Sequence, residues 1–263
     1  MAARPNPDAA RASAAPPPAD ALALHGLRYR WPGAAHDALV LDDFRLAPGE
    51  TVFLRGPSGC GKSTLLGLAA GVLLPQAGTS TLLGQRWSAL SGAGRDRHRA
   101  AHVGYIFQQF NLLPYLSVLD NVRLPVRFSP ARAARTAPGD AEALLARTGL
   151  AERHWRAPAA TLSVGQQQRV AAARALIGRP EVVIADEPTS ALDEDLRESF
   201  MALLLGACAQ AGSALLFVSH DRRLAERFGR VVDLPELNLA LADHGTAIPR
   251  GDRRPATAGE GLA

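Results

Sequence analysis

The chain has 263 residues, a formal net charge of +4 and 47% hydrophobic residues, which fits one globular domain with a sizeable core. Its apolar runs all fall short of the ~18 residues that suggest a membrane-spanning helix. Two cysteines, Cys60 and Cys208, are too few for a disulfide framework. The arginines are scattered, so we expect an ordinary solvated surface and no nucleic-acid partner.

The two ends of the chain differ in composition from the middle. Residues 1–21 are rich in Ala and Pro, and residues 244–263 consist largely of Gly, Pro, Ala and Arg. Such segments bury too little apolar surface to fold, and the first lacks the apolar stretch of a signal peptide. We predict disordered tails at 1–21 and 244–263 and a folded domain at 22–243. The protein should stay in the cytoplasm unless a partner holds it at a membrane.

The first strong motif in chain order is a glycine-rich loop between an expected strand at 51–54 and an expected apolar helix from Leu65. The loop fits the pattern G-x-x-x-x-G-K-[ST], in which backbone N–H groups and a helix N-terminus converge on phosphate oxygens. A chance glycine-rich turn is the weaker reading, because strand, loop and helix follow in order. The expected phosphate-binding residues are Gly56, Pro57, Ser58, Gly59, Cys60, Gly61, Lys62, Ser63 and Thr64.

Two residues of this loop stand out chemically. Lys62 is the only lysine among 29 Lys and Arg residues, which marks a position where the broad guanidinium of Arg would not serve. Cys60 lies beside Lys62 and a helix N-terminus, and both favour the thiolate. We therefore predict that Cys60 is alkylated faster than Cys208, which lies in an apolar helix expected at 201–211, and that ATP protects it.

Further along the chain, polar residues follow two buried strands. Asp186 and Glu187 come directly after an apolar strand expected at 181–185, where one carboxylate can orient Mg²⁺ and the other can polarise a water. The alternative is a pair of solvated turn residues. His220 follows a second apolar strand at 214–218, although an isolated loop histidine is usually inert.

A third segment, residues 162–169, reads Leu-Ser-Val-Gly-Gln-Gln-Gln-Arg and precedes an Ala-rich helix that should end near Ile177. Ser163 and the bare glycine N–H of Gly165 can offer donors to an anion. An ordinary helix N-cap explains the same residues, and this segment alone does not decide between the two.

Together and in this order, Lys62, Gln108, Ser163, Glu187 and His220 resemble the motifs of an ABC ATPase. The likeness extends from about residue 22 to residue 234. It implies an α/β fold of the P-loop NTPase type, with a RecA-like core at about 22–107 and 178–243. An antiparallel β layer near the N-terminus and an inserted α-helical subdomain at about 108–177 complete the fold implied by the resemblance.

The resemblance also implies a role for individual residues. An aromatic that stacks on adenine corresponds to Trp31, with Tyr29 as second choice. Glu187 resembles the catalytic base, and His220 the histidine that contacts the γ-phosphate. Ser63, Gln108 and Asp186 correspond to Mg²⁺ ligands, and Gln108 also corresponds to the residue that touches the attacking water. Ser163, Gly165 and Gln166 correspond to the signature, which binds ATP held by the other subunit. Asp193 corresponds to an aspartate at the dimer seam.

The sequence departs from the family pattern in two places. Val164 replaces a glycine in the signature, which leaves the class intact but puts the turnover rate in doubt. Residues 231–237 lack the usual glycine turn, which puts the last strands in doubt.

Residues 107–122 resemble the lipoprotein-release and macrolide-export branch of the family. The expected cofactors are ATP and Mg²⁺, and the expected partners are a second ATPase subunit, identical or not, and a separate permease that holds the pair at the inner face of the membrane. Cell-envelope remodelling without transport is the alternative. An ABC ATPase of DNA repair would need long coiled-coil insertions, and an ABC translation factor would carry two cassettes in one chain. This sequence shows neither feature, so we disfavour both classes. The cargo and the direction of transport cannot be read from this chain.

Overall fold

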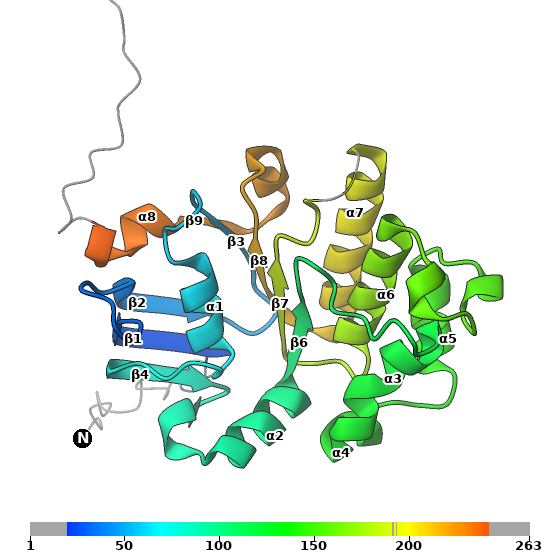
Figure 1. The fold of residues 1–263 in the computed structure, drawn as a ribbon, viewed down its shortest axis with the longest axis horizontal. Helices are drawn as coiled ribbons and strands as arrows, with labels where there is room; N and C mark the ends of the chain where they lie inside the picture. Colours follow the sequence, from blue (N-terminus) through cyan, green and yellow to red (C-terminus); the bar gives the residue numbers. More distant parts are fainter. Residues whose placement is uncertain (1–19, 191, 193, 242–263) are drawn as a thin grey trace, which may run out of the picture.

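The structure, a computed structural model, describes residues 20–190, 192 and 194–241. In this part of the chain, two β-sheets and a group of helices are arranged side by side (Figure 1). The strands are β1 (Leu22–Tyr29), β2 (Leu39–Leu46), β3 (Thr51–Arg55), β4 (Ala77–Leu82), β5 (Gln85–Arg86), β6 (Val103–Ile106), β7 (Val182–Asp186), β8 (Ala214–Val218) and β9 (Arg230–Asp233). The helices are α1 (Lys62–Ala69), α2 (Gly92–His102), α3 (Val118–Phe128), α4 (Pro130–Ala134), α5 (Asp140–Arg147), α6 (Val164–Leu176), α7 (Glu194–Ala211) and α8 (Leu234–Leu237).

The smaller sheet is antiparallel and has the strand order β2-β1-β4-β5. Its first strand begins directly after Ala21, which we had placed in the disordered tail. Ala21 is buried, and its amide donates to the carbonyl of Leu46 at 2.9 Å. The folded domain therefore includes this residue, because Ala21 pairs with the end of β2.

The larger sheet is parallel, with the order β6-β7-β8-β3-β9. Side chains alternate between its two faces, so the near-continuous apolar runs of β3, β7 and β8 feed two cores. Val52 and Leu54 face the core shared with α1 and the antiparallel sheet. Phe53 faces the opposite core, shared with α6 and α7. Helix α1 thereby lies between the two sheets (Figure 1).

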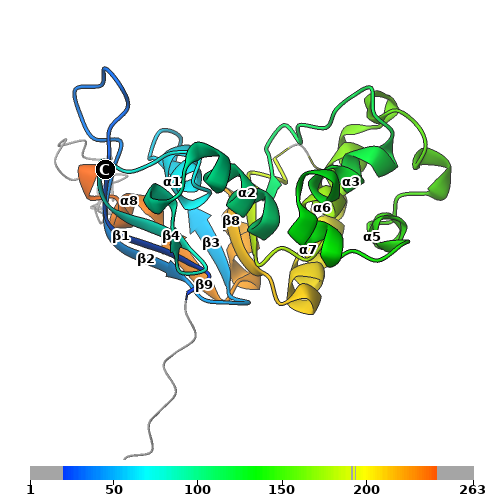
Figure 2. The same cartoon turned by 90° about the horizontal axis from the view of Figure 1, so that it is seen from below.

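Helices α3 to α6 form a third group with its own core, which includes Val118, Leu145 and Val170. Figure 2 shows this group at the opposite end of the molecule from the antiparallel sheet. Helix α6 belongs to two cores, since Ala171 and Leu176 pack toward α7 while Val170 packs toward α3 and α5. The α/β fold with an antiparallel layer and a helical subdomain, predicted from the sequence, is confirmed.

The chain turns helical where the glycine turn is missing. Strand β9 is the last strand within the described ranges, and α8 starts immediately after it, followed by a single 3₁₀ turn at Leu239–Leu241. Leu234 is fully buried against the first core and anchors this segment. None of the helices in the described part of the chain is long and apolar enough to cross a membrane.

Candidate functional site

The glycine-rich loop connects the carboxyl end of β3 to α1. Gly59 and Gly61 have φ values of +82° and +103°, a conformation that side chains with a Cβ rarely adopt. Lys62 is the first residue of α1, and its Nζ donates to the carbonyl of Gly56 at 2.7 Å and to that of Pro57 at 3.2 Å. The loop carbonyls thus surround the Lys62 ammonium group, which lies at the positive N-terminal end of α1.

Two neighbouring strands bring acidic and imidazole groups to the same edge. Asp186 ends β7, and Glu187 follows it with its amide hydrogen-bonded to the carbonyl of Val218 at 2.9 Å. The Glu187 Oε2 lies 2.9 Å from His220 Nδ1, and its Oε1 lies 3.9 Å from Lys62 Nζ. Glu187 is only 8% exposed and has a φ of 46°, a costly conformation for a residue other than glycine. Parallel strands place these groups together because their carboxyl ends share one edge.

Asp186 has an unusual electrostatic environment. Burial raises the pKa of its carboxyl group, and the adjacent negative charge of Glu187 raises it further, while Lys62 acts in the opposite direction. Two carboxylates side by side with one ammonium leave uncompensated negative charge at this position. A bound cation would offset it.

Most of the predicted residues line one cavity of about 700 Å³, although Gly56, Pro57 and Cys60 of the phosphate loop do not. Trp31 is 45% exposed at this cavity and meets the ring of Tyr29 edge-on, with centroids 5.2 Å apart. Tyr29 itself is buried in the core, so it cannot offer a ring face to a ligand, and the second choice for the adenine contact is wrong. The other predicted residues that line the cavity are Ser58, Gly59, Gly61, Lys62, Ser63, Thr64, Gln108, Asp186, Glu187 and His220.

Cys60 behaves differently from our expectation. Its side chain is only 3% exposed and packs inward, near Gly56, and burial raises the pKa of its thiol more than the charge of Lys62 lowers it. The prediction that Cys60 favours the thiolate is therefore wrong. Lys62 does lie nearby and lowers the pKa of the thiol, but burial raises that pKa by more. Burial also raises the pKa of Cys208, to about 12.

The signature residues do not line this cavity. Ser163 is the N-cap of α6: its Oγ accepts from the Gln166 amide at 3.3 Å, and Gln166 Oε1 accepts from the Ser163 amide at 3.0 Å. This reciprocal pair is the capping box that an ordinary helix start would show. Ser163 is exposed, Gly165 is half-buried, and the Val164 side chain between them is 48% exposed. The helix end is thus solvent-facing and outside the cavity that holds Lys62.

A family model described as "ABC transporter" matches residues 41–190, more than half of the chain. The chain belongs to the ABC transporter family. It is 43% identical over 203 residues to the lipoprotein-releasing system ATP-binding protein LolD of Hydrogenovibrio crunogenus, covering 76% of this chain and 86% of LolD. It is 40% identical to the uncharacterized ABC transporter ATP-binding protein YbbA of Escherichia coli K12, covering 83% and 96%.

Two further similarities bear on the size and state of this ABC ATPase. The macrolide export ATP-binding/permease protein MacB of Rhodopseudomonas palustris is 38% identical across 89% of this chain, which spans only 35% of MacB. Among solved structures, the ATP-binding cassette MJ0796, dimeric in a post-hydrolysis state with ADP and Pi, matches with a TM-score of 0.73 and 32% identity, covering 81% of this chain and 93% of MJ0796. The chain is thus an ATP-binding subunit with ATPase activity, of the kind found in LolD and MacB.

Several residues at the nucleotide cavity were not predicted from the sequence. Asp37, Ala38 and Leu241 line the cavity, and they carry no motif that could have indicated it. The buried Gln168 donates from Nε2 to the carbonyl of Pro188 and so joins α6 to the segment after Glu187. Its place in the signature helix was the only available signal. Asp193 lies outside the described residues.

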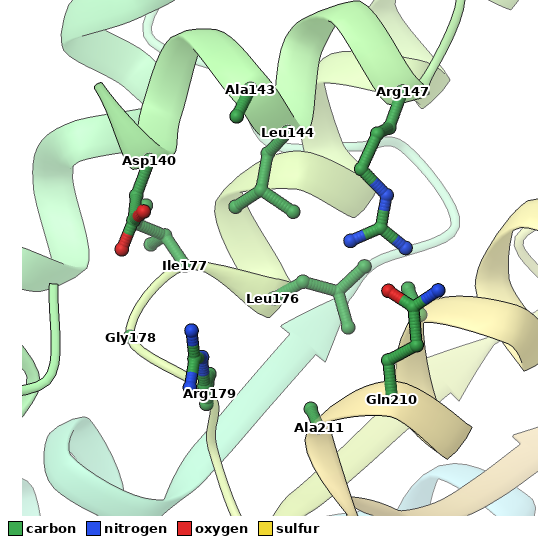
Figure 3. A pocket seen from close by; sticks show the side chains of 11 residues that line it. Asp140, Ala143, Leu144, Arg147, Leu176, Ile177, Gly178, Arg179, Gln210 and Ala211 are labelled. Atoms are coloured by element: carbon green, nitrogen blue, oxygen red, sulfur yellow. The ribbon is translucent and has the colours of Figure 1, made fainter. Parts of the chain in front are cut away.

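A second cavity, of about 240 Å³, lies between α5 and the ends of α6 and α7 (Figure 3). Arg147, Arg179 and Gln210 stand at its rim, and all three are exposed. Among its described lining residues, none belongs to the glycine-rich loop or follows the carboxyl end of β7 or β8. It is separate from the nucleotide site.

Proposed function

We propose that this ABC ATPase works as a head-to-tail dimer that couples ATP hydrolysis to export, or to extrusion of a lipoprotein or another substrate, by a separate permease. The observation that carries the proposal is a division of the site. Lys62, Glu187 and His220 meet within one cavity, whereas Ser163 faces solvent outside it. A second chain can bring its own Ser163 to that cavity.

Within one chain, the residues have distinct tasks in hydrolysis. Lys62 offsets negative charge on the phosphates, and the Trp31 ring stacks on the adenine of ATP. Glu187 is held by His220 and by its own strained backbone at the strand ends, where it can take a proton from a water aligned with the γ-phosphate. The water oxygen then bonds to the γ-phosphorus while the bond from that phosphorus to the bridging oxygen of ADP breaks, so ADP and phosphate leave and Glu187 holds the proton.

The oxygen donors for Mg²⁺ are also in place. Ser63, Gln108 and Asp186 line the same cavity and supply hydroxyl, amide and carboxylate oxygens, the ligand types that Mg²⁺ prefers. Burial and, after it, the negative charge of Glu187 raise the pKa of Asp186, and a bound cation would act in the opposite direction. When bound, Mg²⁺ would reduce the charge on the phosphate oxygens.

The dimer follows from symmetry and is supported by the dimeric state of MJ0796. If the Ser163 of each chain completes the site of the other, two equivalent sites form about a two-fold axis. The free N-terminus of α6 then points its donors at the phosphate, and we assign Gly165 and Gln166 to the same contact. Opening and closing of this pair would drive a partner.

The partner is proposed to be an integral membrane permease, which would hold the ATPase at the cytoplasmic face of the membrane. MacB, by its name, combines an ATP-binding part with a permease, and LolD is the ATP-binding protein of a lipoprotein-releasing system. A groove of about 560 Å³ runs between α1 and α3 and exposes Val72, Phe107 and Phe128, which are 63%, 39% and 73% exposed. Phe107 directly precedes Gln108, so a helix bound here would touch the residue next to the nucleotide cavity.

Copurification from detergent-solubilised membranes tests this assignment. The tagged chain should retain a multi-span membrane protein, and Phe128→Arg should release it because the exposed apolar ring that a partner would cover is replaced by a charge. Tyr115→Arg is the matched control, since Tyr115 is 74% exposed but does not line the groove. Equal recovery with both variants would contradict the docking surface, and recovery of no membrane protein by the wild type would contradict the permease.

Envelope remodelling without transport is the second candidate. The two functions differ in whether a purified ATPase–permease complex in liposomes moves a cargo across or out of the bilayer during ATP hydrolysis.

A further inference from the structure

The segment after β9, residues 234–241, forms part of the nucleotide site. We call it the C-terminal segment; it comprises α8, Asn238 and the 3₁₀ turn at Leu239–Leu241. Leu241 lines the nucleotide cavity, and Leu234 is fully buried in the core. The position between them, Asn238, is 1% exposed, so its polar side chain is enclosed in protein.

Asn238 uses its whole hydrogen-bonding capacity. Its Nδ2 donates to the carbonyls of Ala38 and Cys60, both at 3.1 Å, and its Oδ1 accepts from the amides of Val40 at 2.9 Å and Ala240 at 3.2 Å. An amide side chain has two donor hydrogens and two acceptor lone pairs, and all four are satisfied here. A buried group of this kind fixes its neighbours because losing any bond leaves a buried polar atom unpaired.

The groups that Asn238 joins belong to two loops that contribute residues to the nucleotide cavity. Ala38 closes the loop that carries Trp31, while Cys60 precedes Gly61 and Lys62 in the phosphate loop. A Cβ on Gly61 would lie 3.1 Å from the Ala38 oxygen and 3.3 Å from Asn238 Nδ2, so the loops meet closely at this point. One side chain therefore bridges the base side and the phosphate side.

We propose that Asn238 is a positioning residue that sets the spacing between the Trp31 loop and the phosphate loop, and so tunes affinity for a nucleotide that spans both. The proposal rests on the proposed assignment of Trp31 to the base. A ligand that reaches both loops depends on their spacing, whereas a ligand that reaches only the phosphate loop does not. Asn238 contacts none of Glu187, His220 or Gln108 among its described hydrogen bonds, so its role lies in binding.

The test compares Mg·ADP with pyrophosphate, a probe of the phosphate side alone, by calorimetry and by competition. Asn238→Ala should raise the Kd for Mg·ADP about tenfold, the scale set by losing buried hydrogen bonds. The Kd for pyrophosphate should rise less than about threefold on the same scale, because pyrophosphate reaches only the phosphate loop and does not depend on the spacing of the two loops.

Asn121→Ala is the matched control. Asn121 is also a fully buried asparagine, bonded through Oδ1 to the Leu113 amide and through Nδ2 to the carbonyls of Leu113 and Ser117, and these partners belong to neither the Trp31 loop nor the phosphate loop. It should lower the melting temperature and leave both Kd values unchanged. If Asn238→Ala only lowers the melting temperature, or weakens both ligands equally, the positioning role is wrong.

Hydrogen exchange in the wild-type protein gives a test that needs no variant. Mg·ADP should slow exchange of the Val40 and Ala240 amides, which donate to Asn238, and pyrophosphate should not. Unchanged exchange at both amides with Mg·ADP bound would overturn the proposal. If this test fails while Mg·ADP still binds the wild type and Trp31→Ala weakens that binding, only the role of Asn238 is wrong. Failure of the wild type to bind Mg·ADP would overturn the proposed function as well.

Discussion

The phosphate loop and the signature helix are both loop-to-helix junctions, yet they differ in what surrounds them. Lys62 at the start of α1 is largely enclosed, and its partners are Glu187, which follows β7, and the carbonyls of Gly56 and Pro57, which follow β3. Ser163 at the start of α6 is exposed, and its hydrogen bonds stay within its own helix start. The comparison shows that one chain gathers Lys62 and its partners in a cavity but leaves the N-terminus of α6 exposed outside that cavity.

The largest effect should come from the enclosed region. Glu187→Gln keeps the side-chain shape and removes the base, so ATP turnover should fall by about 10²–10⁴, the usual contribution of a general base. Nucleotide binding should persist, and the variant should accumulate as an ATP-bound dimer. Steady-state turnover and sedimentation measure these two properties. Near-normal turnover in a preparation free of contaminating ATPase would remove Glu187 from the chemistry.

A pair of variants separates the two regions by affinity. Lys62→Ala should weaken binding of Mg·ADP to the isolated chain by about tenfold to a hundredfold, since hydrogen bonds to charged groups contribute about 1.5–3 kcal/mol. Ser163→Arg should leave that affinity unchanged while abolishing turnover. Titration of each variant at a chain concentration too low for dimers decides it. Weaker binding in Ser163→Arg would place the signature in the site of its own chain.

The base side of the cavity should show a smaller effect. Trp31→Ala should weaken Mg·ADP binding about fivefold or more, because stacking on an aromatic ring contributes about 1–3 kcal/mol. Pyrophosphate, which has no base, should bind equally well to both proteins. Arg30→Ala is a neighbouring control, as Arg30 does not line the cavity. A loss of affinity that is the same for both ligands would mean that Trp31 supports the fold and not the base.

The smallest effect concerns the thiols. Burial raises the pKa of Cys60 and of Cys208, so little of either is thiolate at neutral pH, and alkylation should be slow. The rate should rise as pH increases through 9 and beyond, because a raised pKa moves formation of the thiolate to higher pH. Peptide mapping after timed labelling follows each cysteine. Rapid labelling of Cys60 at pH 7 would restore the low-pKa prediction.

The sequence predicted those parts of the fold that depend on local patterns. The expected strands at 51–54, 181–185 and 214–218 are within one residue of β3, β7 and β8, because their apolar runs are unbroken. The cavity residues were found because motif order carries information about strand ends. Cys60 was misjudged because local charge is visible in a sequence, while desolvation depends on what packs over the thiol.

The C-terminal segment could not be predicted for a related reason. Asn238 contacts residues 198 and 178 positions earlier in the chain, at Val40 and Cys60, and no local pattern reports such contacts. The strained backbone of Glu187 is equally hidden, since an acidic residue carries no sign of a positive φ. Both features arise only when distant elements close around the cavity.

Mixing two inactive variants tests the central claim most directly. Lys62→Ala and Ser163→Arg homodimers each carry a lesion in both sites, whereas their heterodimer concentrates both lesions in one site and leaves the other intact. With Glu187→Gln in both chains, the purified heterodimer should trap one ATP per dimer, and neither homodimer should trap any. A heterodimer that assembles but traps no more ATP than its parents would contradict a site shared between Lys62 of one chain and Ser163 of the other.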